Sequence, residues 1–268
     1  MNNNKFIVAL TVSLLWPLFS ATHFGAVKTG VYDAKEKGVE YSVFVPKDFN
    51  PQKKYPLILA LYEGSGGDFH AKEYVDYWMD VAKKRGYVVV CPEAKAEQER
   101  GQVWKPLHWE LVDDPPRILN LLPSLKSKYN IDPNRILLVG IGSFPLYVGI
   151  NNPVHFSAVA AINGYITISN PPNSSRLNRY NTDSKRYFVA DMEKAINITS
   201  DKKNQIPVLF VNGKDCLKVL KEDDVKNSVQ KLKNSGYDAS YQIIDGMGCY
   251  HDEKVNPIIL DWFESKTK

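Results

Sequence analysis

The most constraining feature of the sequence is an apolar run that stops at a glycine-rich corner, between Arg135 and Pro145. Ile136 to Val139 is a β-branched and leucine run of strand length, and Gly142 and Ser143 follow it closely. A buried strand that leads through a tight turn into a helix is a unit of α/β proteins with a parallel sheet. The corner therefore predicts an α/β fold with Ser143 near the carboxyl end of a central strand.

The rest of the chain has the same organisation, with apolar runs of strand length alternating with helical periods. We expect strands at 30–34, 39–45, 57–61, 87–91, 157–164, 206–213 and 239–244. We expect helices at 71–85, from 113 onward, at 224–234 and at 256–265. This alternation predicts a mostly parallel sheet with helices on both faces, and the length of 268 residues suits a single domain over 22–268.

The N-terminus is typical of a secretory signal peptide. Lys5 supplies a positive charge, residues 6–19 are mostly apolar, and small residues at 20–21 suit a cleavage site. The alternative is that the run stays as a membrane anchor, but it is shorter than the roughly 20 residues that span a bilayer, and Pro17 interrupts it. We therefore expect residues 1–21 to be removed, leaving a secreted or periplasmic protein without a membrane segment.

The distribution of charge and the spacing of the histidines argue against nucleic-acid binding and metal binding. The formal charge of +4 comes from lysines that are scattered along the chain, so we expect no nucleic-acid partner. The histidines are His23, His70, His108, His155 and His251. They show no paired ligand spacing, so we expect neither a metal ion nor another cofactor.

Three polar positions follow expected strands and are candidates for a site. Ser143 follows the central corner, Asp215 follows strand 206–213, and His251 follows strand 239–244. Sites in parallel sheets lie at the carboxyl ends of the strands. A hydroxyl, a carboxylate and an imidazole in one place can perform nucleophilic catalysis. Alone, Asp215 could be a turn residue and His251 a surface histidine; together they favour a site.

A glycine loop follows strand 57–61, with Gly64 and Ser65 at its centre. It is not a phosphate cradle of the usual kind, because no Gly-Lys-Ser or Gly-Lys-Thr follows. It is either a plain turn or a loop whose backbone N–H groups stabilise a developing oxyanion. The order of strand, glycine loop, helix and strand favours the oxyanion loop, although the carboxylate of Glu63 would repel such a charge.

Several segments carry a family resemblance, namely residues 55–61, 64–67, 131–136 and 156–164. From about residue 38 to 264 the chain resembles the α/β-hydrolase superfamily, and most closely the secreted polyhydroxybutyrate-depolymerase-like and feruloyl-esterase-like carboxylic ester hydrolases. The resemblance implies ester hydrolysis by a serine within the pattern Gly-x-Ser-x-Gly. It would place that serine at position 142, the acid near Asp215 and the base near His251.

The chain departs from the family pattern at the nucleophile. Gly142 stands where the serine belongs, and the glycine loop begins with Tyr62 and Glu63 where the family has His-Gly. One interpretation is a degenerate hydrolase that still binds a small-molecule or polymeric ester-like ligand. The alternative is an active esterase that uses Ser143 as a displaced nucleophile with Asp215 and His251. A third is chemistry by other groups, such as a water molecule activated by His251.

The cysteines number three, so at least one is unpaired. Cys91 ends an expected strand and is interpreted as a small buried residue. Cys216 and Cys249 lie next to the loops of Asp215 and His251, which are neighbours in this fold. We therefore expect a disulfide between them, the alternative being two separate thiols.

Residues 165–205 lack a clear period and are rich in asparagine, serine, proline and arginine. A segment of this length forms either a cap over the site or a surface insertion. It contains two triplets that match N-glycosylation acceptors, beginning at Asn173 and Asn197.

Overall fold

The computed structural model describes residues 27–62, 70–94, 109, 111–167, 195–218 and 221–267. The expected signal peptide over 1–21, the glycine loop with Gly64 and Ser65, and most of the expected cap or insertion, including Asn173, lie outside these ranges.

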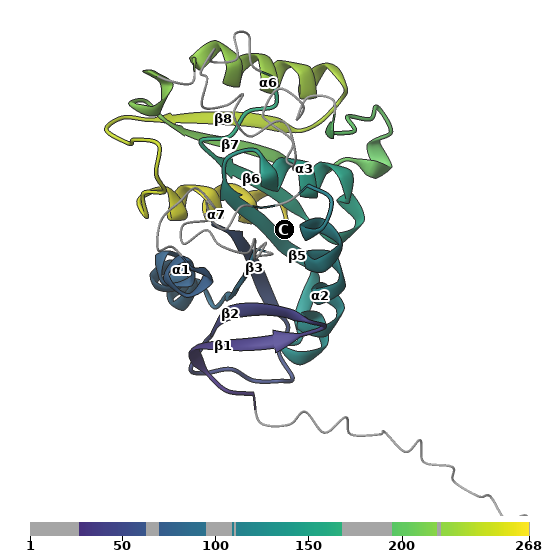
Figure 1. Ribbon diagram of the computed structural model, residues 1–268, viewed down its shortest axis with the longest axis vertical. Helices are drawn as coiled ribbons and strands as arrows, with labels where there is room; N and C mark the ends of the chain where they lie inside the picture. Colours follow the sequence, from purple (N-terminus) through teal and green to yellow (C-terminus); the bar gives the residue numbers. More distant parts are fainter. Residues whose placement is uncertain are drawn as a thin grey trace, which may run out of the picture.

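The described residues form an eight-stranded sheet in the order β1-β2-β4-β3-β5-β6-β7-β8 (Figure 1). The strands are β1 (Gly30–Glu36), β2 (Val39–Val45), β3 (Tyr55–Leu61), β4 (Val88–Pro92), β5 (Ile131–Ile141), β6 (Ala158–Ile162), β7 (Val208–Gly213) and β8 (Ala239–Ile244). β2 is antiparallel to both β1 and β4, whereas all pairs from β4 to β8 are parallel. The predicted mostly parallel α/β fold is confirmed.

Helices cover both faces of the sheet. They are α1 (Ala71–Arg85), α2 (Asp114–Lys128), α3 (Phe144–Asn151), α6 (Glu222–Asn234) and α7 (Val255–Lys266). α1 and α7 share one apolar core with one set of alternating sheet residues, and α2, α3 and α6 share the other core with the opposite set. Strands that are buried on both faces explain the continuous apolar runs in the sequence. No helix in the described ranges is long and apolar enough to span a bilayer.

Helix α1 has the bounds that its sequence predicts. Its buried face includes Tyr74, Val75 and Trp78, and basic side chains close its last turn. Gly86 follows at φ 72°, a left-handed conformation that glycine adopts without strain and that commonly ends a helix. This helix matters for the site because Tyr74 and Trp78 lie on the face that meets the loop after β8.

One local prediction is corrected by the start of β5. Asn, Asp and Pro at positions 130–134 are typical turn residues and predict a turn before the central strand, whereas the strand already begins at Ile131. Ile131 is opposite Tyr55 and Ile136 is opposite Leu57, so extra residues bulge out between two paired positions. The Asp132 carboxylate accepts a hydrogen bond from the Asn134 N–H at 3.0 Å and closes this bulge.

Candidate active site at the carboxyl ends of the strands

The corner between β5 and α3 has the backbone of a sharp elbow, with glycine at its tip. Gly142 adopts φ +76° and its N–H donates to the carbonyl of Ile162 at 2.8 Å. Among the residues that the structure describes, none has a heavy atom within 4 Å of a Cβ atom added at Gly142. A side chain would therefore fit the space, and only the positive φ would strain it. The corner offers room for a side chain where the sequence supplies none.

The hydroxyl of Ser143 is held by the backbone of the loop after β6. Its Oγ donates to the Tyr165 carbonyl at 2.5 Å and accepts from the Tyr165 N–H at 3.2 Å. The side chain is buried, and Ser143 is the N-cap residue of α3. Ser143 therefore ties the first turn of α3 to the segment that follows β6.

His251 is buried against helix α1. Its ring centroid lies 5.3 Å from that of Tyr74, 5.4 Å from Tyr77 and 5.3 Å from Trp78. Its Nε2 is 2.6 Å from the Oδ1 of Asn256 in α7. Among the described residues, Nδ1 has no hydrogen-bond partner. The imidazole is thus packed between α1 and α7.

The contacts of Asn256 define the tautomer of His251. Asn256 donates through Nδ2 to the Tyr77 carbonyl at 2.6 Å, so its Oδ1 is an acceptor and Nε2 of His251 carries the proton. Burial lowers the pKa of His251 to about 4, more than the Asn256 contact and Asp252 raise it. The ring is therefore neutral at pH 7, with its free lone pair on Nδ1. In a catalytic triad Nε2 accepts the serine proton and Nδ1–H binds the acid, which is the opposite arrangement.

Asp215 lies just after β7, next to the loop that leads to His251. Asp215 is exposed, and its backbone N–H donates to the carbonyl of Met247 at 3.0 Å. The structure thus brings the two loops together through the backbone. The catalytic roles of Ser143, Asp215 and His251 stay predictions.

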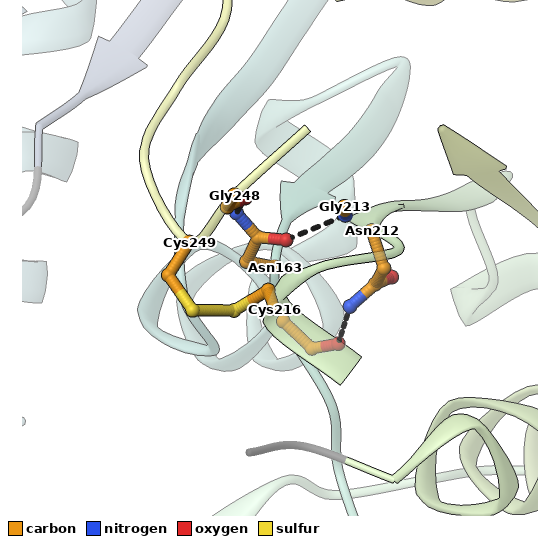
Figure 2. The surroundings of a disulfide bond; sticks show 7 residues. Asn163, Asn212, Gly213, Cys216, Gly248 and Cys249 are labelled. Atoms are coloured by element: carbon orange, nitrogen blue, oxygen red, sulfur yellow. Dashed lines mark hydrogen bonds between the residues drawn. A yellow bond between two sulfur atoms is a disulfide. The ribbon is translucent and has the colours of Figure 1, made fainter. Parts of the chain in front are cut away.

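The expected disulfide between Cys216 and Cys249 is present (Figure 2). It joins the loop after β7 to the loop after β8, with a Cα–Cα distance of 4.6 Å. Cys91 is a free thiol buried at the end of β4, as predicted. Burial in apolar surroundings raises the pKa of the Cys91 thiol, so it is poorly reactive.

A pair of asparagines adds a hydrogen-bond network beside the disulfide (Figure 2). The Asn163 side chain accepts from the Gly213 N–H at 2.8 Å and donates to the Gly248 carbonyl at 3.2 Å. The Asn212 side chain donates to the Gly164 carbonyl at 3.2 Å. Together with the disulfide, these bonds form a clamp on the ends of β6 and β7 and on the loop after β8.

Sequence reasoning did not single out Asn163, Asn212 or Asn256. The one available signal was Asn163 before a glycine at a strand end, because asparagine tolerates the left-handed conformation that it adopts here at φ 54°. Each of the three amides donates to a backbone carbonyl of a segment far along the chain, and periodicity does not reveal such partners.

Gly213→Ala is expected to lower the free energy of unfolding by roughly 2 kcal/mol, because a well-packed site must rearrange. A Cβ at Gly213 would lie 2.3 Å from the Met247 carbonyl oxygen and 2.4 Å from that of Gly248. Urea denaturation measures the change. Gly248→Ala is the matched control, since its Cβ would lie more than 4 Å from every described residue outside its own chain neighbours. Equal stability of the two variants would contradict the close contact at Gly213.

Several solved structures of esterases and related hydrolases have the same fold as this chain. A ferulic acid esterase is 18% identical, with a TM-score of 0.59 over 90% of this chain and 97% of that one. An S-formylglutathione hydrolase from Agrobacterium tumefaciens is 14% identical, with a TM-score of 0.63 over 89% and 95%. A thermostable esterase is 18% identical, with a TM-score of 0.56 over 89% of this chain and 63% of its own. At these identities the likeness shows the α/β-hydrolase fold.

Similarity to a curated sequence is local. A probable dipeptidyl-aminopeptidase B of Uncinocarpus reesii is 41% identical over 51 residues, which are 19% of this chain and 6% of that protein. This chain therefore matches only a small part of that relative. The match to a family is much longer, since residues 35–250 fit the family model Esterase, described as "Putative esterase". The chain belongs to this esterase family.

Proposed function

We propose that this chain is an exported member of the esterase family that binds an ester-like ligand without using a serine nucleophile. The observation that carries the proposal is Gly142, which occupies the tip of the elbow, with no described atom within 4 Å of the position that a Cβ would take. Serine esterases attack the ester carbonyl with a hydroxyl from this position. Without that hydroxyl, binding is retained and the acyl-enzyme step is lost.

The neighbouring serine is a poor substitute. Both hydrogen-bond directions of the Ser143 hydroxyl are used by the backbone of Tyr165. Nε2 of His251, the nitrogen that takes the serine proton in a triad, already carries a proton directed at Asn256. An attack by Ser143 would therefore require both side chains to leave their present partners.

The ligand follows from the family and from the open elbow. Ferulic acid esterase, one of the similar structures, is named for an aromatic acid. Trp109 stacks on Phe144 with ring centroids 5.1 Å apart, and Phe144 begins the helix that follows Gly142. An aryl ester, free or attached to a polymer, therefore suits the aromatic surroundings of the elbow.

Export is supported by the signal-like N-terminus and by the disulfide, which persists in oxidising compartments.

Fluorophosphonate labelling tests the proposal. The purified mature protein and Ser143→Ala are incubated with the probe and analysed by peptide mapping, and we expect no specific serine label in either. A label on Ser143 that disappears in Ser143→Ala would overturn the proposal and establish a displaced nucleophile. Calorimetry with methyl ferulate is the second test. We expect it to detect binding of the ester, and we expect no ferulic acid to be released. Ester cleavage that survives Ser143→Ala but is lost in His251→Gln would instead indicate water activation by His251.

Gly142→Ser and Gly142→Ala are expected to cost about the same stability, roughly 1 kcal/mol, because only the positive φ opposes them. None of the described residues lies close enough to a Cβ at Gly142 to add a steric cost. Urea denaturation of both variants checks this, and a cost of serine much greater than that of alanine would contradict it. Any labelling that Gly142→Ser gains over Gly142→Ala would report the restored hydroxyl.

A further inference from the structure

The two edges of the sheet differ in how they are protected. Natural edge strands usually carry charges, prolines or bulges that prevent pairing with another chain. β1 follows this rule, since Asp33, Lys35 and Glu36 lie along it. β8 does not, because its six residues, Ala-Ser-Tyr-Gln-Ile-Ile, contain no charge and no proline. Within the described ranges, no strand pairs with the outer edge of β8.

The hydrogen bonds to β7 define which groups of β8 point outward. The Val208 N–H donates to the Asp238 carbonyl, and the Lys214 N–H donates to the Ile244 carbonyl, both at 2.9 Å. Backbone groups of successive strand residues point to opposite sides, so the even-numbered residues face β7. The residues whose N–H and C=O groups face away from β7 are therefore Ala239, Tyr241 and Ile243. Tyr241, at the centre, is 38% exposed.

We propose that β8 pairs with β8 of a second copy of this chain, antiparallel and around a two-fold axis at Tyr241. In this register Tyr241 lies opposite the partner's Tyr241, and Ala239 lies opposite the partner's Ile243. The outward N–H and C=O groups of each strand then form hydrogen bonds with those of the other. Such an isologous contact closes after two copies and continues the sheet across the interface.

Charge favours a second copy as the partner. The exposed Lys214–Asp245 pair, at 2.7 Å, lies at one end of β8, and the Lys266–Asp238 pair, at 2.7 Å, lies at the other. The two-fold axis brings one end of each strand to the opposite end of its partner. Lys214 of one copy then lies near Asp238 of the other, and Lys266 lies near the other copy's Asp245. Each end of the strand therefore presents both signs of charge to its partner. The strand between these two ion pairs carries no charge of its own, so it is complementary to itself.

Sedimentation across a concentration series tests the dimer, with Tyr241→Pro as the disrupting variant. Proline at 241 removes an N–H that points outward, so the ladder between β7 and β8 is retained. We expect a dimer for the wild type and a dissociation constant at least about tenfold higher for Tyr241→Pro. Tyr241→Thr keeps the N–H and should remain dimeric. A monomeric wild type, or a dimer that Tyr241→Pro leaves unchanged, overturns the proposal.

Cysteine cross-linking tests the register without weakening the strand. Residues of a hydrogen-bonded antiparallel pair have Cα atoms about 5.5 Å apart, within the range that a disulfide bridges. We expect Tyr241→Cys to form a covalent dimer under mild oxidation. Val154→Cys is the control, because Val154 is 79% exposed on another segment. Cross-linking of Tyr241→Cys no faster than that of Val154→Cys would refute the paired register.

Discussion

Replacing both Cys216 and Cys249 with serine is expected to lower the free energy of unfolding by about 4 kcal/mol, from the entropy of closing a loop of this size in the unfolded chain. The two cysteines are 33 residues apart in sequence. The crosslink restricts the unfolded chain much more than the folded one, in which the asparagine network already holds the same loops. Urea denaturation of the double variant and of the wild type measures the difference.

Dithiothreitol and Cys91 provide the controls for this prediction. The reductant should destabilise the wild type by a similar amount and should leave the double variant unchanged. Cys91→Ala should retain its sensitivity to dithiothreitol, because Cys91 is a free thiol. A wild type that loses less than about 1 kcal/mol on reduction would show that the folded clamp does not depend on the crosslink.

Acidification from pH 7 to pH 5 is expected to remove about 2 kcal/mol of stability through His251 alone, by proton linkage. Burial lowers the pKa of His251 to about 4 from its ordinary value of 6.5. The unfolded state therefore binds a proton between these two values, and the folded state does not. The contribution of His251 is complete above pH 6.5 and is lost as the pH falls toward 4. Denaturation midpoints between pH 7.5 and pH 5 measure this slope.

His251→Gln isolates this effect, because an amide can still bond to Asn256 and does not titrate in this range. Its stability at pH 7 can differ from that of the wild type, so the slope against pH is the quantity to compare. His155→Gln is the second control. Partial burial lowers the pKa of His155 as well, but its ring is half-buried, so its removal should change the slope much less. Equal slopes for the wild type and His251→Gln would contradict the buried neutral imidazole.

Most of the architecture could be predicted because it depends on local periodicity. Apolar spacing, together with the residues that typically begin and end helices and strands, predicts the helix at 71–85 and the strands from 39–45 to 239–244. The pairing of Cys216 with Cys249 followed from the neighbouring loops that the resemblance implied. The bulge in β5 was missed because Asp132 and Pro133 resemble a turn, and only pairing with β3 shows that the strand includes them.

The chemistry of the candidate site could be predicted only in part. The sequence placed His251 after the last strand, but its ring orientation depends on Tyr74, Tyr77 and Trp78, which are more than 170 positions earlier in the chain. Similarly, the partner of Ser143 is the backbone of Tyr165, and a backbone group has no side-chain signature. Tertiary contacts of this kind decide whether a histidine and a serine can react together.

The disulfide also acts as a test of strand register. It closes the β7–α6–β8 unit, and its cysteines lie just beyond the two strands that this unit pairs. Because each strand residue advances by about 3.3 Å, a slip of β8 by two residues would move Cys249 by roughly 7 Å relative to Cys216. Starting from a Cα–Cα distance of 4.6 Å, such a slip would exceed what a disulfide can span. Oxidation of this pair therefore selects chains in which β8 has docked in its native alignment.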